Sequence, residues 1–380
     1  MYSNGKESLA TDLPFTEIIA ALPSTVPFVG PEALERRTGR RFKVRLGANE
    51  SAFGLSPRAL AAMSRAVEGT AWYCDPECFA LQSELARHHG VDPCHISVGA
   101  GIDDLLGLAV RLFVSPGEAV VTSNGAYPTF SYHVFGFGGR LLTVPYRDDR
   151  EDPEALLDAA ISARARLVYL ANPDNPMGTW SEAAEIKRAI ARLPSGCVLI
   201  LDEAYCEFAP AESQWGLELD DPRILRMRTF SKAHGMAGAR IGYAIAHEEV
   251  VAALNKIRNQ FGVNRIAQEG ALASLGDRGF VDSVVREVGR GRDEYRALGA
   301  ELGLPALPSA TNFVALDIGS GVRARELQAG LLQEAVFVRM PGVAPLDRCI
   351  RVTVGTAEER RQFAAILREV LPKIITGTDE

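Results

Sequence analysis

The sequence offers little that points to a membrane, to secretion or to a bound metal. Its 380 residues contain no run of about 20 consecutive apolar residues, the length that a helix needs to cross a bilayer. Residues 1–12 are polar and do not resemble a signal peptide. The six cysteines stand apart, with neither a CxxC pair nor a histidine cluster beside them. We therefore expect a soluble, cytoplasmic protein with reduced thiols and no metal site.

An excess of basic residues is also missing. The formal net charge is −7, with 41 lysines and arginines against 48 aspartates and glutamates. A nucleic acid or an anionic membrane surface is therefore not the expected partner. With 47% hydrophobic residues, a chain of this length suits one large domain and a smaller one that share a cleft. We expect that cleft to bind small molecules.

Short apolar runs alternate with segments of helical periodicity through the middle of the chain. Strands that are apolar on both faces and separated by helices indicate a mainly parallel sheet covered on both sides, and hence an α/β protein. The predicted strands are Ala119–Thr122, Leu141–Pro145, Leu167–Ala171, Val198–Leu201, Ile224–Met227 and Ile241–Ile245.

After about residue 247 the pattern changes to long helices followed by short strands. The predicted helices cover about 248–260, 264–275, 281–303 and 357–371, and the predicted strands are Asn312–Asp317, Val336–Arg339 and Ile350–Val354. These elements suit a smaller α+β domain. We expect residues 1–45 to form an N-terminal arm and part of this small domain, 46–275 the large domain, and 276–380 the rest of the small domain.

Two motifs follow predicted strands and carry reactive groups. Asp202 ends the apolar run Val198–Leu201, at the edge where open α/β sheets hold ligands, and Tyr205 comes three residues later. A buried carboxylate needs a partner such as a protonated pyridine nitrogen, although capping a helix or meeting a structural arginine would also satisfy it. In Thr229-Phe-Ser-Lys232, hydroxyls stand beside one lysine, and Arg240 follows. This set suits a phosphate next to an imine-forming amine, whereas most lysines are solvated surface groups.

Two further motifs join a strand end to a turn or a helix. In Asn172-Pro-Asp-Asn-Pro-Met-Gly178, two Asn-Pro steps fix a turn that is either a plain loop or places Asn175 to donate a hydrogen bond to a phenolate oxygen. In Val98-Gly-Ala-Gly-Ile-Asp-Asp104, glycines lead into a helical pattern, as at a helix N-terminus that binds an anion. A dinucleotide fingerprint begins in the same way, but it requires a third glycine where this chain has Asp104.

In their order along the chain, these motifs resemble those of the fold-type I aminotransferases, which depend on pyridoxal 5'-phosphate (PLP), and most closely the histidinol-phosphate aminotransferase branch. The resemblance runs from about Arg45 to the C-terminus. It also includes Asn49-Glu50, Tyr73-Cys-Asp-Pro76, Pro128-Thr-Phe130, Asn264 and Ile350-Arg-Val-Thr-Val-Gly355. It implies a large α/β domain whose mainly parallel sheet is flanked by helices, a smaller α+β domain, and a homodimer with shared active sites.

The resemblance also implies roles around the cofactor ring. Lys232 is the lysine that forms a Schiff base with PLP, and it moves the substrate's proton once released. Asp202 pairs with the pyridinium nitrogen, which makes the ring an electron sink. Tyr205 and Asn175 donate to the ring's O3', and Phe130 stacks on the ring face.

The remaining roles concern the phosphate and the substrate. The phosphate is bound by hydroxyls, a guanidinium and backbone amides, supplied by Thr229, Ser231, Arg240, Ala100, Gly101 and Ile102. Tyr73 arrives from the other subunit, and Arg351 clamps the substrate carboxylate through two parallel hydrogen bonds, unless it forms a structural ion pair. Arg339 is a second anion site or a surface ion pair. Asn49 and Phe28 also lie near the substrate.

The sequence departs from the family's pattern at several points. Ser51-Ala-Phe-Gly54 follows Asn49-Glu50 where relatives have Asn-Pro-Tyr-Gly, Met177 replaces a threonine, and Ile102 stands where many relatives place a serine. Phe28 lies near the position where histidinol-phosphate enzymes offer a tyrosine to the substrate's phosphate. The substrate therefore stays open between histidinol phosphate and an aromatic amino acid, with a 2-oxo acid as acceptor.

Two other functions compete with aminotransfer. A PLP-dependent decarboxylase, lyase or oxidase of the same branch would share nearly every motif, because the bond of Cα that aligns with the ring decides the reaction. A non-catalytic PLP-binding regulator would carry a DNA-binding domain, and about 45 residues before the cofactor core leave no room for one.

Overall fold

The computed structural model describes residues 13–23 and 29–375. Its centre is a seven-stranded sheet with the order β2-β8-β7-β6-β5-β3-β4. The strands are β2 (Ile96–Gly99), β3 (Ala119–Ser123), β4 (Arg140–Val144), β5 (Leu167–Ala171), β6 (Val198–Asp202), β7 (Ile224–Thr229) and β8 (Gly242–Ile245). All neighbours from β4 to β7 pair in parallel, whereas β8 is antiparallel to both β7 and β2. The predicted α/β fold with a mainly parallel sheet is confirmed.

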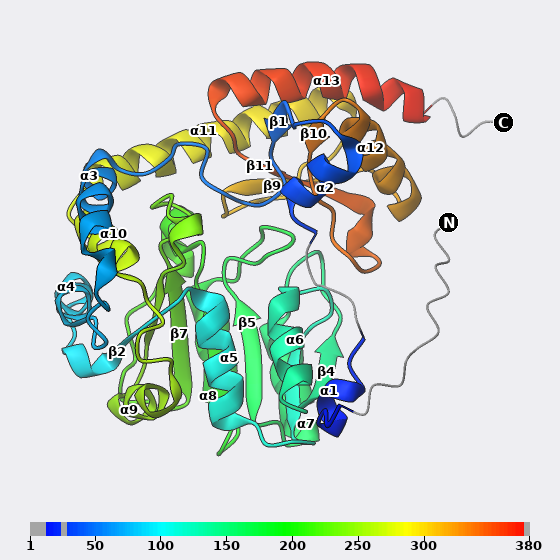
Figure 1. Cartoon of the computed structure of the whole chain (residues 1–380). Helices are drawn as coiled ribbons and strands as arrows, with labels where there is room; N and C mark the ends of the chain where they lie inside the picture. The colour runs from blue at the N-terminus through cyan, green and yellow to red at the C-terminus, as the bar shows by residue number, and fades with distance from the viewer. Residues whose placement is uncertain (1–12, 24–28, 376–380) are drawn as a thin grey trace.

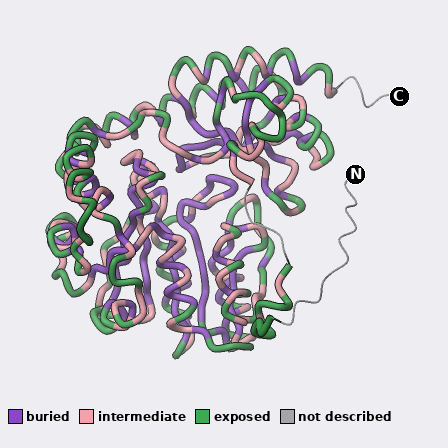
Figure 2. The backbone as a smooth tube through the Cα atoms, viewed as in Figure 1, coloured by how far each residue is buried: buried purple, intermediate pink, exposed green. Residues whose placement is uncertain are grey.

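Helices cover both faces of this sheet, which explains why β2, β3, β5, β6 and β8 are buried along their whole length (Figures 1 and 2). One face packs against α5 (Ile102–Phe113), α6 (Pro128–Gly136) and α9 (Glu248–Ile257). The other face packs against α7 (Pro153–Ala163) and α8 (Ala183–Ala191), and near β2 and β8 against α4 (Phe79–His89) and α10 (Arg265–Leu275). Successive residues of β5 alternate between the two cores, as a strand's period of two requires.

A second group of elements lies above the sheet in the view of Figure 1. It comprises α11 (Arg278–Leu302), α12 (Gly321–Gln333), α13 (Ala357–Ile375), the antiparallel pair β9 (Phe313–Asp317) and β11 (Cys349–Thr353), and β10 (Val336–Phe337). The N-terminal strand β1 (Val44–Arg45) pairs in parallel with β10, and Val44 and Leu46 are buried in the same core. The domain limits at residues 45 and 275 stay a prediction.

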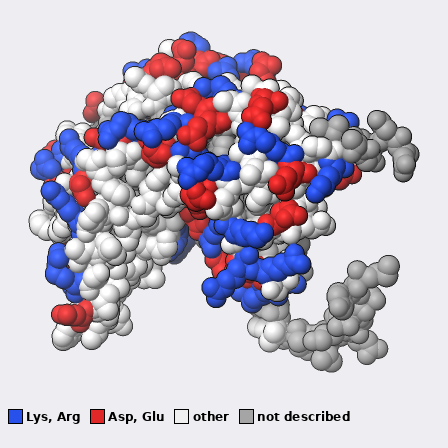
Figure 3. Space-filling model, turned by 90° about the horizontal axis from the view of Figure 1, so that it is seen from above, with Lys and Arg blue, Asp and Glu red and all other residues white. Residues whose placement is uncertain are grey.

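Three further α-helices lie in the N-terminal part of the chain: α1 (Glu17–Ala20), α2 (Pro31–Thr38) and α3 (Pro57–Ala66). Over the described residues, none of the helices combines the length and the apolar character needed to span a membrane. The face that carries α11 to α13 presents acidic and basic side chains interspersed with each other (Figure 3). The predicted strand Val336–Arg339 ends two residues early, because beyond Phe337 the chain turns to pair Arg339 with Arg351 in an isolated bridge.

Candidate active site

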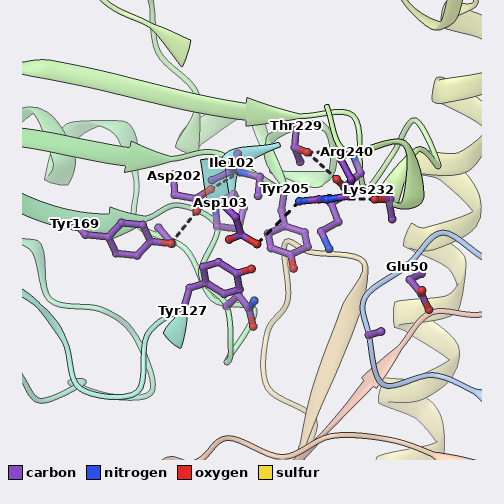
Figure 4. Close-up of a pocket in the computed structure, with 17 residues that line it drawn as sticks. Glu50, Ile102, Asp103, Tyr127, Tyr169, Asp202, Tyr205, Thr229, Lys232 and Arg240 are labelled. Atoms are coloured by element: carbon purple, nitrogen blue, oxygen red, sulfur yellow. Dashed lines mark hydrogen bonds and ion pairs between the residues drawn. The ribbon is translucent and has the colours of Figure 1, made fainter. Parts of the chain in front are cut away.

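A cavity of about 360 Å³ opens at the carboxyl edge of the central sheet. The parallel strands β5, β6 and β7 all end there, so that Ala171, Asp202 and Thr229 line one cavity although they lie far apart in sequence. The N-terminus of α5 enters from the same edge and adds Ile102 (Figure 4). This is where open α/β sheets place their ligands.

Asp202 lines the cavity and is buried. One carboxylate oxygen accepts a hydrogen bond from the Tyr169 hydroxyl at 2.7 Å, and the other accepts from the Ala204 N–H at 3.0 Å (Figure 4). Burial raises the pKa of Asp202 to about 6, against the hydrogen bonds from Tyr169 and Ala204. A carboxylate in this position is stabilised by a cation placed in the cavity.

Lys232 follows β7 and points into the same cavity (Figure 4). Its ammonium group donates to the backbone oxygen of Asn49 at 3.1 Å. Burial, followed by the nearby Arg351 cation, lowers the pKa of Lys232 to about 8. A lysine with this pKa supplies a useful fraction of neutral amine near neutral pH, which is the form that attacks a carbonyl.

A cluster of hydroxyls and one guanidinium forms the third part of the cavity. The Thr229 hydroxyl donates to Ser231 Oγ at 2.9 Å, and both residues line the cavity with Arg240. Arg240 lies against Gly101, whose φ of +91° suits glycine and where an added Cβ would come within 2.6 Å of the guanidinium. The first N–H groups of α5, at Ile102 and after it, have no partner within their helix. Together these groups form a site for a doubly charged anion.

Two of the backbone amides predicted for this anion site are already used. The Ala100 N–H donates to the Asp104 carboxylate at 2.9 Å, and the Gly101 N–H donates to the Gly99 oxygen at 2.8 Å. Ala100 also does not line the cavity. The structure therefore contradicts the amide prediction at these two positions, because the turn before α5 uses both donors. For Ile102 it stays a prediction.

Asn49, Tyr205 and Thr353 form a buried hydrogen-bonded network beside Lys232. The Asn49 amide donates to the Tyr205 hydroxyl at 2.9 Å, and the Thr353 hydroxyl donates to Asn49 Oδ1 at 3.2 Å. Burial raises the pKa of Tyr205 to about 12, so its hydroxyl keeps its proton and remains a donor. Asn175 lines the cavity as well, and its side-chain oxygen accepts a hydrogen bond from Arg351.

A second cavity of about 480 Å³ adjoins the first and shares Lys232, Tyr205 and Asn175 with it. Both predicted substrate arginines, Arg339 and Arg351, line it. Their backbones pair, and burial lowers the pKa of Arg351 to about 10. A buried guanidinium of this kind favours an anion beside it.

Arg339 is held from two sides. Its guanidinium donates to the Val29 oxygen at 2.9 Å and lies over the Phe337 ring at 5.3 Å from the centroid. Phe28, the next residue before Val29, lies outside the described residues. The contact nevertheless brings the N-terminal segment to the wall of the second cavity.

The prediction that Phe130 faces the cofactor ring is wrong for this cavity. The Phe130 side chain is fully buried and stacks on Tyr169, with ring centroids 4.6 Å apart, in the core behind the cavity wall. Tyr127 lines both cavities instead, with Tyr169 lining the first (Figure 4). A signal for Tyr127 was available, because Pro128 favours the first position of a helix and leaves the residue before it at the N-cap, next to the sheet edge.

Tyr73 does not line the cavities of its own chain. Its side chain is 80% exposed and packs only partly, on Phe261, with centroids 4.6 Å apart. Trp72 and Phe79 nearby in the sequence are exposed as well. An apolar surface of this kind is typical of a protein–protein interface.

The arrangement fits PLP. A buried carboxylate suits the ring nitrogen, the hydroxyl and guanidinium cluster suits the phosphate, and an amine with a lowered pKa lines the same cavity. Gly101 and Gly242 leave the space that the anion site requires, since a Cβ on Gly242 would lie 3.2 Å from the Ile102 nitrogen. The second cavity leaves room for a substrate beside Lys232.

Comparisons with known proteins agree with this geometry. The family "Aminotransferase class I and II" matches residues 41–367. Histidinol-phosphate aminotransferase of Moorella thermoacetica is 34% identical over 373 residues, covering 96% of this chain and 95% of its own. Histidinol-phosphate aminotransferase 2 of Ralstonia nicotianae is 37% identical over 332 residues, covering 86% and 88%.

Comparison with solved structures also points to aminotransferases. Histidinol-phosphate aminotransferase from Sinorhizobium meliloti, in complex with PLP, superposes with a TM-score of 0.94 at 48% identity and covers 97% of this chain and 100% of its own. A mutant aspartate aminotransferase of Thermus thermophilus superposes with a TM-score of 0.77 at 26% identity, covering 94% and 99%. The chain therefore belongs to the class I and II aminotransferases, a PLP-dependent family, and within it to the histidinol-phosphate aminotransferase branch.

Proposed function

We propose that this PLP-dependent aminotransferase moves the amino group of histidinol phosphate, or of an aromatic amino acid, to a 2-oxo acid such as 2-oxoglutarate. The observation that carries the proposal is the junction of the two cavities at Lys232. The cofactor groups Asp202, Thr229 and Arg240 line one side of it, and two arginines line the other. PLP, when bound, withdraws electrons from the bond that breaks at the substrate's Cα.

The cofactor end of the site is assigned to residues of the sheet edge. Asp202 stabilises the proton on the ring nitrogen, and its carboxylate is oriented by Tyr169 and the Ala204 amide. Tyr205 donates to O3', with its hydroxyl positioned by Asn49. The amide nitrogen of Asn175 is assigned a second hydrogen bond to O3', because the side-chain oxygen of Asn175 already accepts from Arg351. Tyr127 replaces Phe130 as the residue beside the ring face.

Lys232 is assigned the proton transfer. Its amine accepts the proton that leaves the substrate's Cα, and a pKa of about 8 makes it a base matched to neutral pH. The backbone oxygen of Asn49 accepts from the same amine and so fixes its direction. Holding base and Cα–H bond in one orientation supplies most of the advantage that positioning gives to such a step.

The two arginines determine the substrate class. Arg351 binds the carboxylate of the 2-oxo acid or amino acid, and Arg339 lies beside it on the same cavity wall. A second guanidinium favours a phosphate at the far end of the substrate, as in histidinol phosphate. The names of the relatives from Moorella and Ralstonia support the same choice.

We also propose a homodimer in which Tyr73 of each subunit completes the partner's site. The exposure of Tyr73 and its absence from the lining of its own cavities support this. The Tyr73→Phe and Lys232→Ala variants provide a test, since mixed dimers contain one site free of both changes. Partial recovery of activity after the two inactive or weakened variants are mixed and re-dimerised supports the proposal, and no recovery contradicts it. A cytoplasmic location stays a prediction.

The function itself is tested by spectroscopy of the purified holoenzyme. Histidinol phosphate, phenylalanine and glutamate are added one at a time, and the visible absorption of the cofactor is followed. We expect one donor to convert the cofactor to its aminated form and 2-oxoglutarate to convert it back to PLP. Release of CO2, ammonia or peroxide as the main product would favour a decarboxylase, a lyase or an oxidase instead. No spectral change with any amine would indicate a non-catalytic binding protein.

A further inference from the structure

A buried amide outside the assigned site shares a hydrogen-bond acceptor with Lys232. Asn312, directly before β9, is 2% exposed and lines neither cavity. Its side-chain nitrogen donates to the backbone oxygens of Asn49 and Glu50, at 3.1 and 3.3 Å. The Asn49 oxygen also accepts from the Lys232 amine at 3.1 Å. Asn312 is therefore separated from the reactive amine by a single carbonyl group.

The backbone of Asn49 is held in an uncommon conformation. Its φ of +54° lies in the left-handed region, which few residues other than glycine adopt, although asparagine does so more often than most. The Thr353 hydroxyl accepts from the Asn49 N–H at 3.1 Å and donates to its side-chain oxygen at 3.2 Å. These two bonds fix the residue but not the direction of its carbonyl. Among the described residues, the donors to that carbonyl are Asn312 and Lys232.

Packing alone does not account for an amide at position 312. The side-chain oxygen of Asn312 is buried and has no hydrogen-bond partner in the described part of the chain. A buried acceptor without a donor is unfavourable, and an apolar side chain of similar size would avoid that cost. What the amide provides is its nitrogen, which donates to both carbonyls. The two N–H bonds are therefore the contribution that distinguishes Asn312 from a core residue.

The groups that hold Asn49 belong to one two-stranded unit. Strands β9 and β11 pair antiparallel, with Thr353 opposite Phe313, the residue after Asn312. The backbone oxygen of Asn312 accepts from the Val354 N–H at 2.8 Å, which continues the pairing beyond the strand ends. Strand β11 also carries Arg351. The unit that presents the substrate arginine thus also determines where the acceptor of Lys232 lies.

We propose that Asn312 is a positioning residue for the proton transfer, because it orients the Asn49 carbonyl that holds the amine of Lys232. The Asn312 nitrogen belongs to a short, buried side chain, whereas the Lys232 amine ends a flexible stem. A fixed acceptor limits the directions in which that amine points. The inference rests on the proposed function, in which Lys232 transfers the proton.

The expected effect has a sign. A hydrogen bond from an ammonium group stabilises its charged form, so weakening the bond lowers the pKa of the amine. A hydrogen bond that involves a charged group changes such an equilibrium by about tenfold or more. The pKa of Lys232 is about 8 with the bond in place. Without the Asn312 amide, we expect the amine to be neutral more often at pH 7 but directed less well toward the substrate.

The test measures the reactivity of Lys232 in the full-length protein freed of cofactor. Pyridoxal, which lacks the phosphate and so does not depend on the anion site, is added, and imine formation is followed by visible absorption between pH 6 and 9. Lys232→Ala gives the contribution of all other amines, which is subtracted. Asn312→Leu removes the donor at similar volume. Asn312→Ser, whose side chain is shorter, is the second variant in case the leucine prevents folding.

Thr311→Val is the matched control. Thr311 is the neighbour of Asn312 and is also fully buried. Its hydroxyl bonds with Ser309 and Phe313 in its own segment, without reaching Asn49. Its substitution therefore removes buried hydrogen bonds from the same place while leaving the carbonyl that holds Lys232 untouched. Circular dichroism and urea unfolding of each variant report whether the fold is intact.

Wild type and Thr311→Val are expected to show a midpoint near pH 8 in the rate of imine formation. In the Asn312 variants the midpoint falls by about one pH unit, so imine formation at pH 7 becomes about fivefold faster. The half-reaction of their holoenzymes with an amino donor is expected to slow about tenfold. General loosening of the fold would not produce these opposite changes.

An unchanged midpoint in a folded Asn312 variant would overturn the inference. An equal fall in Thr311→Val would overturn it as well, because the shift would then not depend on the Asn49 carbonyl. Imine formation by Lys232→Ala at the wild-type rate would instead overturn the assignment of Lys232 on which the inference rests.

Discussion

The Asp202→Asn variant replaces a buried carboxylate with an amide of the same shape. The structure gives Asp202 one donor on each oxygen, so the amide keeps its oxygen toward Ala204 or Tyr169 and loses the negative charge. Two opposite unit charges about 4 Å apart attract by about 4 kcal/mol at the effective dielectric constant that suits protein sites. Since each 1.36 kcal/mol is tenfold in rate, we expect the half-reaction to slow about 1,000-fold.

The assay is a single turnover of the holoenzyme with an amino donor, followed by stopped-flow absorption of the cofactor. The matched control is Tyr169→Phe, which removes one hydrogen bond to the carboxylate but keeps its charge. A hydrogen bond to a charged acceptor contributes about 1.5 kcal/mol, so we expect the single-turnover rate of Tyr169→Phe to fall about tenfold. A rate for Asp202→Asn within tenfold of the wild type would remove Asp202 from the ring nitrogen.

The raised pKa of Asp202 leads to a prediction of how cofactor affinity depends on pH. In the protein without cofactor its pKa is raised to about 6, so the carboxylate takes up a proton as the pH falls through that value. Only the ionised form attracts a protonated ring nitrogen. PLP affinity, measured by equilibrium dialysis, is therefore expected to fall below about pH 6. Asp202→Asn serves as the control, since it lacks the group, and the same pH dependence in that variant would contradict the assignment.

Three other changes give separate tests. Lys232→Ala is expected to abolish turnover and the covalent attachment of PLP while leaving the circular dichroism spectrum unchanged. Transamination by this variant at the wild-type rate would exclude the mechanism. Arg351→Lys loses the planar pair of donors, so we expect KM for 2-oxoglutarate to rise about 10- to 100-fold in steady-state kinetics, and an unchanged KM would place the carboxylate elsewhere. Glu203→Gln removes the carboxylate whose oxygens lie 2.5 and 2.8 Å from the guanidinium groups of Arg226 and Arg228, and leaves both cations without it. We expect urea unfolding to show a free energy of unfolding lower by about 3–5 kcal/mol. A decrease of less than about 1 kcal/mol would refute this prediction.

The sheet was predictable because its strands are local signals. Most of the parallel strands are short apolar runs buried on both faces, although β4 is partly exposed and β7 contains Arg226 and Arg228. The predicted limits differ from the observed ones by at most two residues from β3 to β8. The site residues that adjoin these strands, such as Asp202 and Lys232, could be placed for the same reason. Asp202 ends β6, and Lys232 lies only a few residues after the end of β7. The topology of the sheet then brings them into one cavity.

Phe130 shows where local reasoning fails. Its motif is adjacent to the cavity, but α6 begins at Pro128, so that Phe130 lies within the first turn and turns its ring toward the core. Tyr127, just before the helix, remains at the edge of the sheet. The two aromatic residues are three positions apart, nearly one helical turn, and the sequence alone does not fix which of them faces the cavity.

The substrate end of the site depends on contacts that no local pattern reveals. Asn49 reaches Lys232 and Tyr205 because the chain before it is fixed to the C-terminal elements, where Leu46 donates to the Phe337 oxygen and accepts from the Thr353 N–H, both at 2.8 Å. These contacts join residues about 300 positions apart. The cofactor end is therefore set by short-range motifs of the sheet, whereas the substrate end is set by how the N-terminal and C-terminal segments meet. Relatives can share the first and differ in the second, which is why aminotransfer follows from the sequence more directly than the choice of substrate does.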